Sequence, residues 1–189
     1  MTAAIGLRDH TGWAALVALS GNADDPVVLD RRRLVLCPPD EPRQPYHAAQ
    51  GMSVDEAAAL VERIAATASR LATEAFAAIA GDHDVVAAGI PVSTMTPPDD
   101  LAAVLGSHTL LHAAEGVLYR EALLDGAEAC GLPVVGVEVK RLYGDLAARL
   151  GRTEDDVRGA LGALGAGLGP PWRAEQKEAA AAAWMALLT

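Results

Sequence analysis

Aromatic residues and cysteines are scarce in this sequence, and each shortage limits what the chain can be. Aromatic residues make up 4% of the 189 residues, so a sizeable core must be built mostly from aliphatic side chains. Cys37 and Cys130 are the two cysteines, and they form neither a CxxC motif nor a zinc-binding pattern. We therefore expect both to be reduced structural residues of a cytoplasmic protein, since disulfides are rare in that compartment.

Long hydrophobic runs are absent as well. No segment approaches the roughly 20 consecutive apolar residues of a membrane-spanning helix, and the run "AAAAAWMALL" near the C-terminus is short and rich in alanine. The N-terminus has no basic region followed by an apolar run, so no signal peptide is predicted. These absences favour a cytoplasmic location with no membrane partner.

Positive charge is also in short supply. The chain has 15 Lys and Arg residues against 25 Asp and Glu, a formal net charge of −10. A protein that holds nucleic acid through many phosphates usually has a basic surface, so this balance disfavours nucleic acid as a partner without excluding it. The basic cluster Arg31 to Arg33 is expected at a sheet edge, where charge discourages aggregation; a strip that contacts phosphates is the alternative.

The sequence does contain a regular succession of strand-like and helix-like segments, which we assign to one domain, residues 1–189. The expected strands, from their apolar runs and turn signals, are residues 3–9, 13–19, 27–36, 85–92 and 133–139. The expected helices are residues 53–80, 99–129 with a break at 106–107, 140–151, 153–164 and 173–188. The first three strands predict an antiparallel meander, and the later strands, each reached through a helix, predict parallel pairing. The order predicts an α/β fold with a mixed five-stranded sheet flanked by helices.

This order of elements resembles the ribonuclease H-like superfamily, which includes ribonucleases H and Holliday-junction resolvases. The opening segment "IGLRDHTGWAALVAL" is similar to the first hairpin of the resolvases, in which an Asp ends the first strand, and Asp9 stands at that position. The resemblance implies clustered carboxylates that hold two divalent ions, Mg²⁺ or Mn²⁺, for phosphodiester cleavage. The segments "RQPYHAA", "HAAEG" and "GPPWRAEQK" also resemble those of a group of bacterial proteins, a resemblance that implies no activity.

The carboxylate set that the superfamily requires is incomplete here. The end of the fourth strand, "GIPVST", offers no acid, whereas the last helix begins with Glu175 and Glu178 one turn apart, with Lys177 between them. The resemblance implies a metal site shared by Asp9 and Glu175. We add Glu115 as a candidate third catalytic carboxylate and Lys177 as a candidate ligand-binding residue. The alternative for Glu175 is structural, because acids in the first turn of a helix stabilise its positive dipole end.

A second candidate site lies in "GSHTLLHAAEGVLYREAL", residues 106–123. The polar residues of this segment follow one another at spacings of 4, 3 and 4, which aligns them on one side of a helix; they are His108, His112, Glu115 and Tyr119. Two histidines at i and i+4 with a carboxylate one turn later could bind a metal ion. The zincin motif HExxH is absent, because no Glu lies between the two histidines.

The same segment has two other interpretations. If Ser107 is the N-cap of the helix, the first turn with His108 is a ready anion site. Otherwise these polar residues pack against the "STMTPP" loop or against a second subunit of a homodimer. The proline-rich loop of residues 37–52 contributes His47 as a further ligand-binding candidate, since long ordered loops are often functional.

Two functional hypotheses follow. The first is a divergent nucleic-acid-processing protein, a phosphodiester hydrolase whose carboxylates Asp9, Glu115 and Glu175 converge. The second is a non-catalytic ligand-binding or dimerisation module that uses the His108–Tyr119 helix face and the loop around His47. The incomplete carboxylate set leaves both an enzyme and a non-enzyme open.

Overall fold

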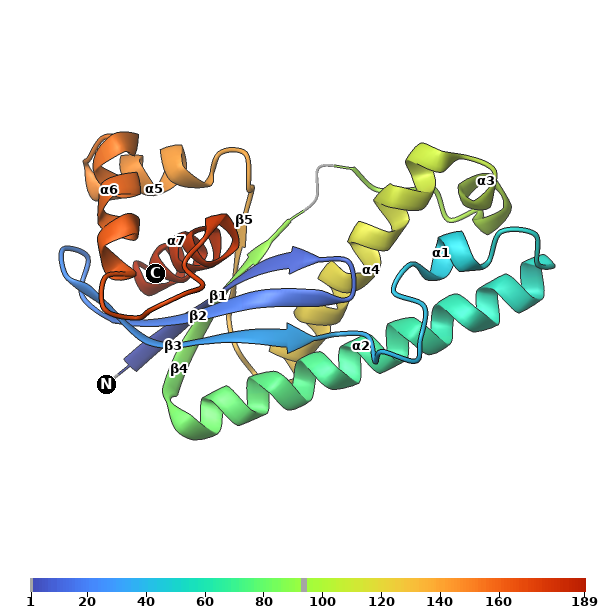
Figure 1. Ribbon diagram of the computed structural model, residues 1–189, viewed down its shortest axis with the longest axis horizontal. Coiled ribbons are helices and arrows are strands. Elements are labelled where there is room, and N and C mark those ends of the chain that lie inside the picture. Colours follow the sequence, from blue (N-terminus) through green and yellow to red (C-terminus); the bar gives the residue numbers. More distant parts are fainter. Residues whose placement is uncertain (1, 93–94) are drawn as a thin grey trace.

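The chain forms a five-stranded sheet in the computed structural model, which describes residues 2–92 and 95–189. The strands are β1 (Thr2–His10), β2 (Trp13–Gly21), β3 (Pro26–Val35), β4 (Asp84–Pro91) and β5 (Val134–Val137). Their spatial order is β3-β2-β1-β4-β5, with antiparallel pairing among the first three and parallel pairing of β4 with β1 and of β5 with β4 (Figure 1). The predicted mixed sheet is confirmed.

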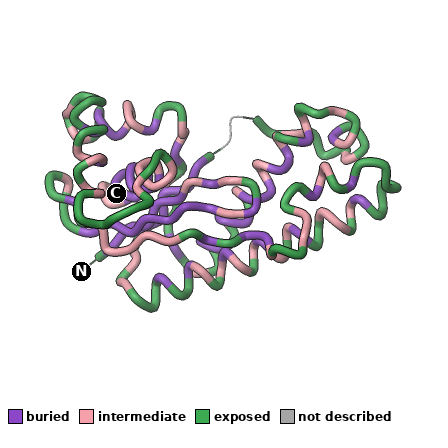
Figure 2. Tube along the Cα trace, in the orientation of Figure 1, coloured by how far each residue is buried: buried purple, intermediate pink, exposed green. Residues whose placement is uncertain are grey.

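Helices cover both faces of this sheet. The helices, in chain order, are α1 (Pro45–Ala48), α2 (Val54–Asp82), α3 (Leu101–Leu105), α4 (His108–Ala129), α5 (Leu142–Leu150), α6 (Glu154–Leu164) and α7 (Ala174–Leu187). The long helices α2 and α4 pack on one face, and α7 lies on the other with α5 and α6 beside it (Figure 1). Buried residues accordingly concentrate in the strands and on the inner sides of the helices (Figure 2).

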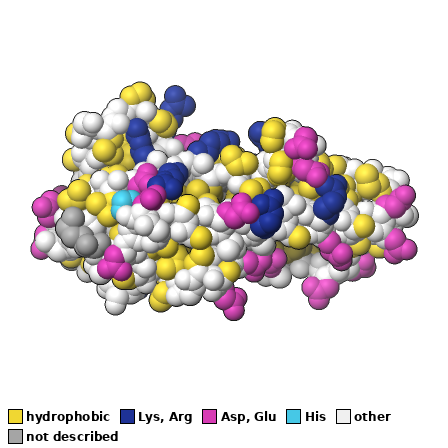
Figure 3. Space-filling model, turned by 90° about the horizontal axis from the view of Figure 1, so that it is seen from below, with side chains coloured by type: hydrophobic (Ala, Val, Ile, Leu, Met, Phe, Trp, Pro, Cys, Tyr) yellow, Lys and Arg dark blue, Asp and Glu magenta, His cyan; other side chains and the backbone are white. Residues whose placement is uncertain are grey.

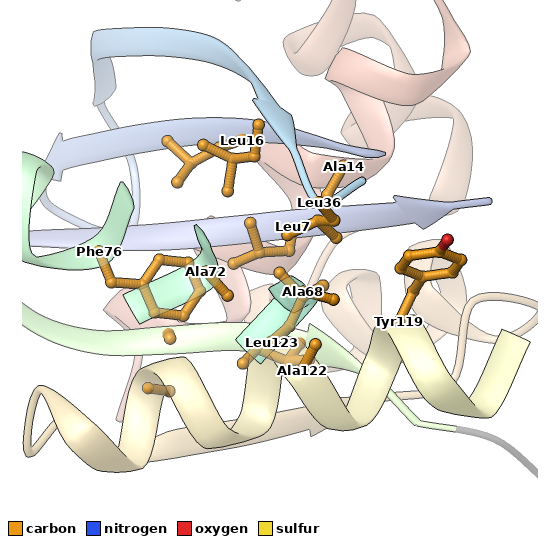
Figure 4. Packing of buried hydrophobic residues seen from close by; sticks show 14 of the residues in the cluster. Leu7, Ala14, Leu16, Leu36, Ala68, Ala72, Phe76, Tyr119, Ala122 and Leu123 are labelled. Carbon is orange, nitrogen blue, oxygen red and sulfur yellow. The ribbon is translucent and has the colours of Figure 1, made fainter. Parts of the chain in front are cut away.

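The core between the sheet and the pair α2 and α4 is aliphatic with two buried aromatic rings. Leu7 and Leu16 from the strands meet Phe76 from α2 and Leu123 from α4, with Tyr119 at the end of the cluster (Figure 4). Burying side chains of this size contributes about 1.5–3 kcal/mol each. This layer fixes α4 against β1, and so fixes the polar residues that α4 carries.

Local signals in the sequence explain where the helices begin and end. Ser53 and Glu56 form the predicted capping box, in which each residue's side chain binds the other's backbone N–H, and Thr153 with Asp156 does the same at α6. Gly151 ends α5 in the left-handed conformation, with φ of 64°. The predicted break in the middle helix is also present, because α3 ends at Leu105 and α4 begins at His108.

One short element differs from the expectation. Residues 45–48 form the single-turn helix α1, although the four prolines of residues 37–52 predicted only a loop. Pro45 stands in the first turn of this helix, where proline needs no backbone N–H and already has a helical φ. This turn carries His47 to the side of α4. Within the described residues, no helix combines the length and hydrophobicity needed to span a lipid bilayer.

Helix α7 lies unusually close to the sheet because both partners lack large side chains at the contact. A Cβ atom on Gly6 would stand 2.0 Å from the carbonyl oxygen of Ala179, and one on Gly89 would stand 2.2 Å from that of Ala182. The alanine run of α7 is fully buried there. The alanine run therefore does more than favour a helix: its small side chains allow the backbone of α7 to contact the backbone of the sheet.

We predict that Gly6→Ala lowers the free energy of unfolding by about 3 kcal/mol, the upper end for overpacking, because the added methyl meets backbone atoms that cannot move aside. The matched control is Gly81→Ala near the end of α2, where a Cβ meets nothing within 4 Å. It should change stability by less than about 1 kcal/mol, in the stabilising direction. Urea unfolding followed by circular dichroism measures both, and equal effects would contradict the close contact.

Candidate functional site

Asp9 lies near the carboxyl end of β1, and guanidinium groups bind both of its carboxylate oxygens. Arg120 of α4 donates from Nε to Oδ2 at 3.0 Å, and Arg8 donates from Nη1 to Oδ1 at 3.1 Å. Asp9 is only 7% exposed. A buried carboxylate that would be costly on its own is therefore neutralised from two sides.

The same network reaches the opposite face of the sheet. Arg8 also donates from Nε to the carboxylate of Glu178 on α7, so β1 is joined to α4 and to α7 through charged side chains. The Nη1 atom of Arg120 is buried and has no hydrogen-bond partner in the described part of the chain. This nitrogen is thus unsatisfied within the described residues.

A cleft of about 330 Å³ opens beside this network at the carboxyl ends of β1, β4 and β5. Open α/β sheets bind ligands at this edge. The charged side chains that line the cleft are Arg8, Asp9, Arg120, Glu138 and Lys140. The acid-free end of β4 contributes Pro91 and Val92, while residues 93–94 of the "STMTPP" loop lie outside the described residues.

Glu175 and Lys177 lie on the first turn of α7, but no hydrogen bond or ion pair joins either of them to Asp9 within residues 2–92 and 95–189. Glu175 lines a separate groove of about 430 Å³ together with Trp13 and Arg173. Of the two acids that begin the last helix, Glu178 is the one that enters the Asp9 network. A ligand-binding role for Lys177, which is half-buried, stays a prediction.

The second cluster joins α1 to the N-terminal half of α4. Glu115 is 2% exposed, and its Oε1 accepts hydrogen bonds from Nδ1 of His47 at 3.0 Å and from the backbone N–H of His47 at 3.3 Å. The ring of His47 in turn faces His112 and His108, with centroid distances of 4.8 and 5.7 Å. Glu115 therefore belongs to the histidine cluster and is bonded to His47, not to Asp9.

Tyr119 and Ser107 take structural positions in α4. The Tyr119 ring is buried, and its hydroxyl donates to the backbone carbonyl of Arg43 at 2.7 Å, which ties the proline-rich loop to the core. Burial raises the pKa of Tyr119, so its hydroxyl stays protonated as a donor. Ser107 is the N-cap of α4, but its side chain makes no capping hydrogen bond.

In the comparisons with known proteins, the matches are to solved structures. No protein-family model and no curated protein sequence matches this chain. Two structures of RuvC from Thermus thermophilus are similar along nearly its whole length. RuvC in complex with a Holliday junction substrate is 18% identical with a TM-score of 0.52, covering 97% of this chain and 89% of that one. The second RuvC structure is 16% identical with a TM-score of 0.55, covering 97% and 90%. The chain has a ribonuclease H-like fold.

The two divalent ions implied by the resemblance to ribonuclease H-like nucleases do not fit the groups around Asp9. Hard cations need several free oxygen ligands, yet both oxygens of Asp9 accept hydrogen bonds from guanidinium groups and Glu178 is bound to Arg8. A guanidinium beside each carboxylate also repels a dication. An ion shared by Asp9 and Glu175 therefore finds no support in this arrangement.

Sequence reasoning missed Arg8 and Arg120 as members of the site. Arg8 directly precedes Asp9, which is a weak signal. Arg120 is 111 residues away from Asp9 in the chain, and its local sequence gives no signal of this contact. Because the contact depends on how α4 docks on β1, no local pattern contains it.

We predict that Tyr119→Phe lowers the free energy of unfolding by about 1 kcal/mol, because the Arg43 carbonyl loses its donor. Cleavage by trypsin after Arg43 should also become faster. Tyr143→Phe is the matched control, since the Tyr143 ring stacks with Arg158 and no hydrogen bond of its hydroxyl is found in the described residues. Equal losses in the two variants would show that the hydroxyl does not anchor the loop.

Proposed function

We propose that this protein binds a nucleic-acid strand through its phosphates at the carboxyl edge of the sheet, without cutting it by a two-metal mechanism. The observation that carries the proposal is the pair of guanidinium groups on Asp9, which stands where the resemblance to resolvases places a metal-binding carboxylate. Arginine side chains bind phosphate oxygens with fixed geometry. In this account they take the electrostatic role that divalent ions have in a nuclease.

A stack of flat side chains extends this edge across the neighbouring strands. The ring of His10 stacks on that of Trp13 at 4.2 Å with an interplanar angle of 8°, and the guanidinium of Arg33 lies over Trp13 at 3.6 Å. Burial and the charge of Arg8 lower the pKa of His10, so this ring is neutral at pH 7. Aromatic and guanidinium surfaces are the ones on which bases of single strands stack.

The pairing of the strands puts these groups on one face of the sheet, beside the groove that Trp13 and Arg33 line. Trp13 pairs with His10 across β1 and β2, and Ala15 pairs with Arg33 across β2 and β3. Side chains two residues apart on a strand share a face, so Arg33, Trp13, His10 and Arg8 follow one another across the sheet. The result is a strip of arginines and aromatic rings that meets the cleft at Arg8.

The net negative charge of the chain limits nucleic-acid binding to the surface where cationic side chains lie. Figure 3 shows acidic side chains spread along one face of the molecule, with several Lys and Arg side chains directly beside them. With a net charge of −10 and few cationic groups at this edge, affinity should be modest and should fall as salt is added. The similarity to RuvC, of which one structure contains a Holliday junction substrate, supports branched DNA as the first ligand to test.

Fluorescence anisotropy with labelled branched and single-stranded DNA at low salt tests the proposal. We predict that Arg120→Gln weakens binding about fivefold and lowers the slope of log affinity against log salt by about 1, as for a lost phosphate contact. The matched control is Arg70→Gln, which removes an equal charge from an exposed pair with Glu74 on α2. No binding by the unmodified protein, or equal losses in the two variants, would contradict the proposal.

Asp9→Asn separates this proposal from the hydrolase hypothesis. In the binding account the variant binds DNA more tightly, because Arg8 and Arg120 no longer share their charge with a carboxylate. A divergent phosphodiester hydrolase predicts instead that the unmodified protein cleaves DNA or RNA with Mg²⁺ or Mn²⁺ and that Asp9→Asn abolishes the cleavage.

A further inference from the structure

The three histidines grouped at the N-terminal end of α4 are not used by the proposed function. Arg120 and His108 are twelve residues apart on one helix, which is about 18 Å along its axis. We propose that His47, His108 and His112 form a binding site for one divalent transition-metal ion of the zinc class. The proposal is independent of nucleic-acid binding.

The positions of the ligand atoms carry the proposal. One ring nitrogen from each histidine can be chosen so that all three lie within 4.8 Å of one another. A tetrahedral zinc site with bonds of about 2.0–2.1 Å places its nitrogens about 3.4 Å apart, so closure around an ion takes only small rotations. His108 and His112 are exposed, so their rings can rotate toward an ion.

Two different elements supply the ligands in a fixed arrangement. His108 and His112 are one turn apart on α4 and share its side, and their ring centroids are 4.5 Å apart. His47 comes from α1, which lies against α4 in Figure 1. The pattern of two histidines from one helix and a third from a distant segment leaves the solvent side open, as in zinc sites that keep a coordination position for water or a ligand.

Glu115 provides the second, independent observation. Its buried carboxylate accepts a hydrogen bond from Nδ1 of His47, which places the proton on Nδ1 and leaves the Nε2 lone pair for a metal. Metal-binding histidines are commonly oriented by such a carboxylate. Glu115 Oε2 is buried without a hydrogen-bond partner in the described residues, and a dication held through His47 would compensate this negative charge.

The donor set defines the class of ion. Three imidazole nitrogens suit Zn²⁺, Co²⁺, Ni²⁺ and Cu²⁺, whereas Mg²⁺ and Ca²⁺ prefer oxygen ligands. Glu115 was expected as a possible ligand one turn after His112; in the structure it orients His47 instead. The open side of the cluster would let a bound ion take a water molecule or an anionic ligand.

Isothermal titration calorimetry of the full chain without a histidine tag tests the site, with ZnCl₂ as the probe and MgCl₂ as the comparison. We expect one Zn²⁺ per chain and no response to Mg²⁺. Losing a residue that orients a ligand typically weakens metal binding by roughly 10–100-fold. His108→Ala and His112→Ala each remove a ligand itself, so each should weaken Zn²⁺ binding by more than that. His83→Ala is the matched control, because His83 lies beside Asp30 and outside the cluster.

Glu115→Gln tests the orienting role apart from the ligands. It should keep one Zn²⁺ per chain and weaken its binding about 10–100-fold. Loading with Co²⁺ adds a second measurement, since tetrahedral coordination by nitrogen gives visible absorption that His112→Ala should remove. Absence of Zn²⁺ binding by the unmodified protein, or equal binding by His83→Ala and His108→Ala, would overturn the proposal.

Discussion

Two guanidinium groups on one buried carboxylate hold the carboxyl edge of this sheet together. Arg120 reaches Asp9 from α4, Arg8 reaches it within β1, and Arg8 also binds Glu178 on α7. An ionised carboxylate at this depth would be destabilising by several kcal/mol if it lost its partners. The helices on both faces are thereby coupled at the point where the fold opens into a cleft, and every functional inference about that cleft depends on this network.

The ribonuclease H-like fold does not by itself determine the chemistry at the carboxyl edge of the sheet. The similarity to RuvC establishes the scaffold, but function depends on the groups placed on a scaffold. Under the proposed function, the arginines and Lys140 at this edge take an anionic ligand, although Asp9 and Glu138 line the same cleft. The proposed metal site lies instead at the N-terminal end of α4, where His47, His108 and His112 lie close together and Glu115 binds His47.

Much of the fold could be predicted from the sequence, and much of the site could not. Capping boxes, apolar runs and glycines are local signals, and they placed the strands, most helix ends and the break before α4. Contacts across the chain have no such signal: Gly6 against Ala179, Arg120 against Asp9, and His47 against Glu115 each depend on how distant elements dock. Glu178 and Glu175 are one turn apart on α7, and it is Glu178 that binds Arg8 of β1 while Glu175 lines the neighbouring groove.

The most direct test of the central claim is a double-mutant cycle between Asp9 and Arg120. Unfolding free energies of the unmodified protein, Asp9→Asn, Arg120→Gln and the double variant isolate the energy that couples the two side chains. The account predicts a favourable coupling of about 2 kcal/mol, within the range for residues in one ion-pair network. Effects that add within about 0.3–0.5 kcal/mol would show that the two side chains do not interact, and would contradict the account.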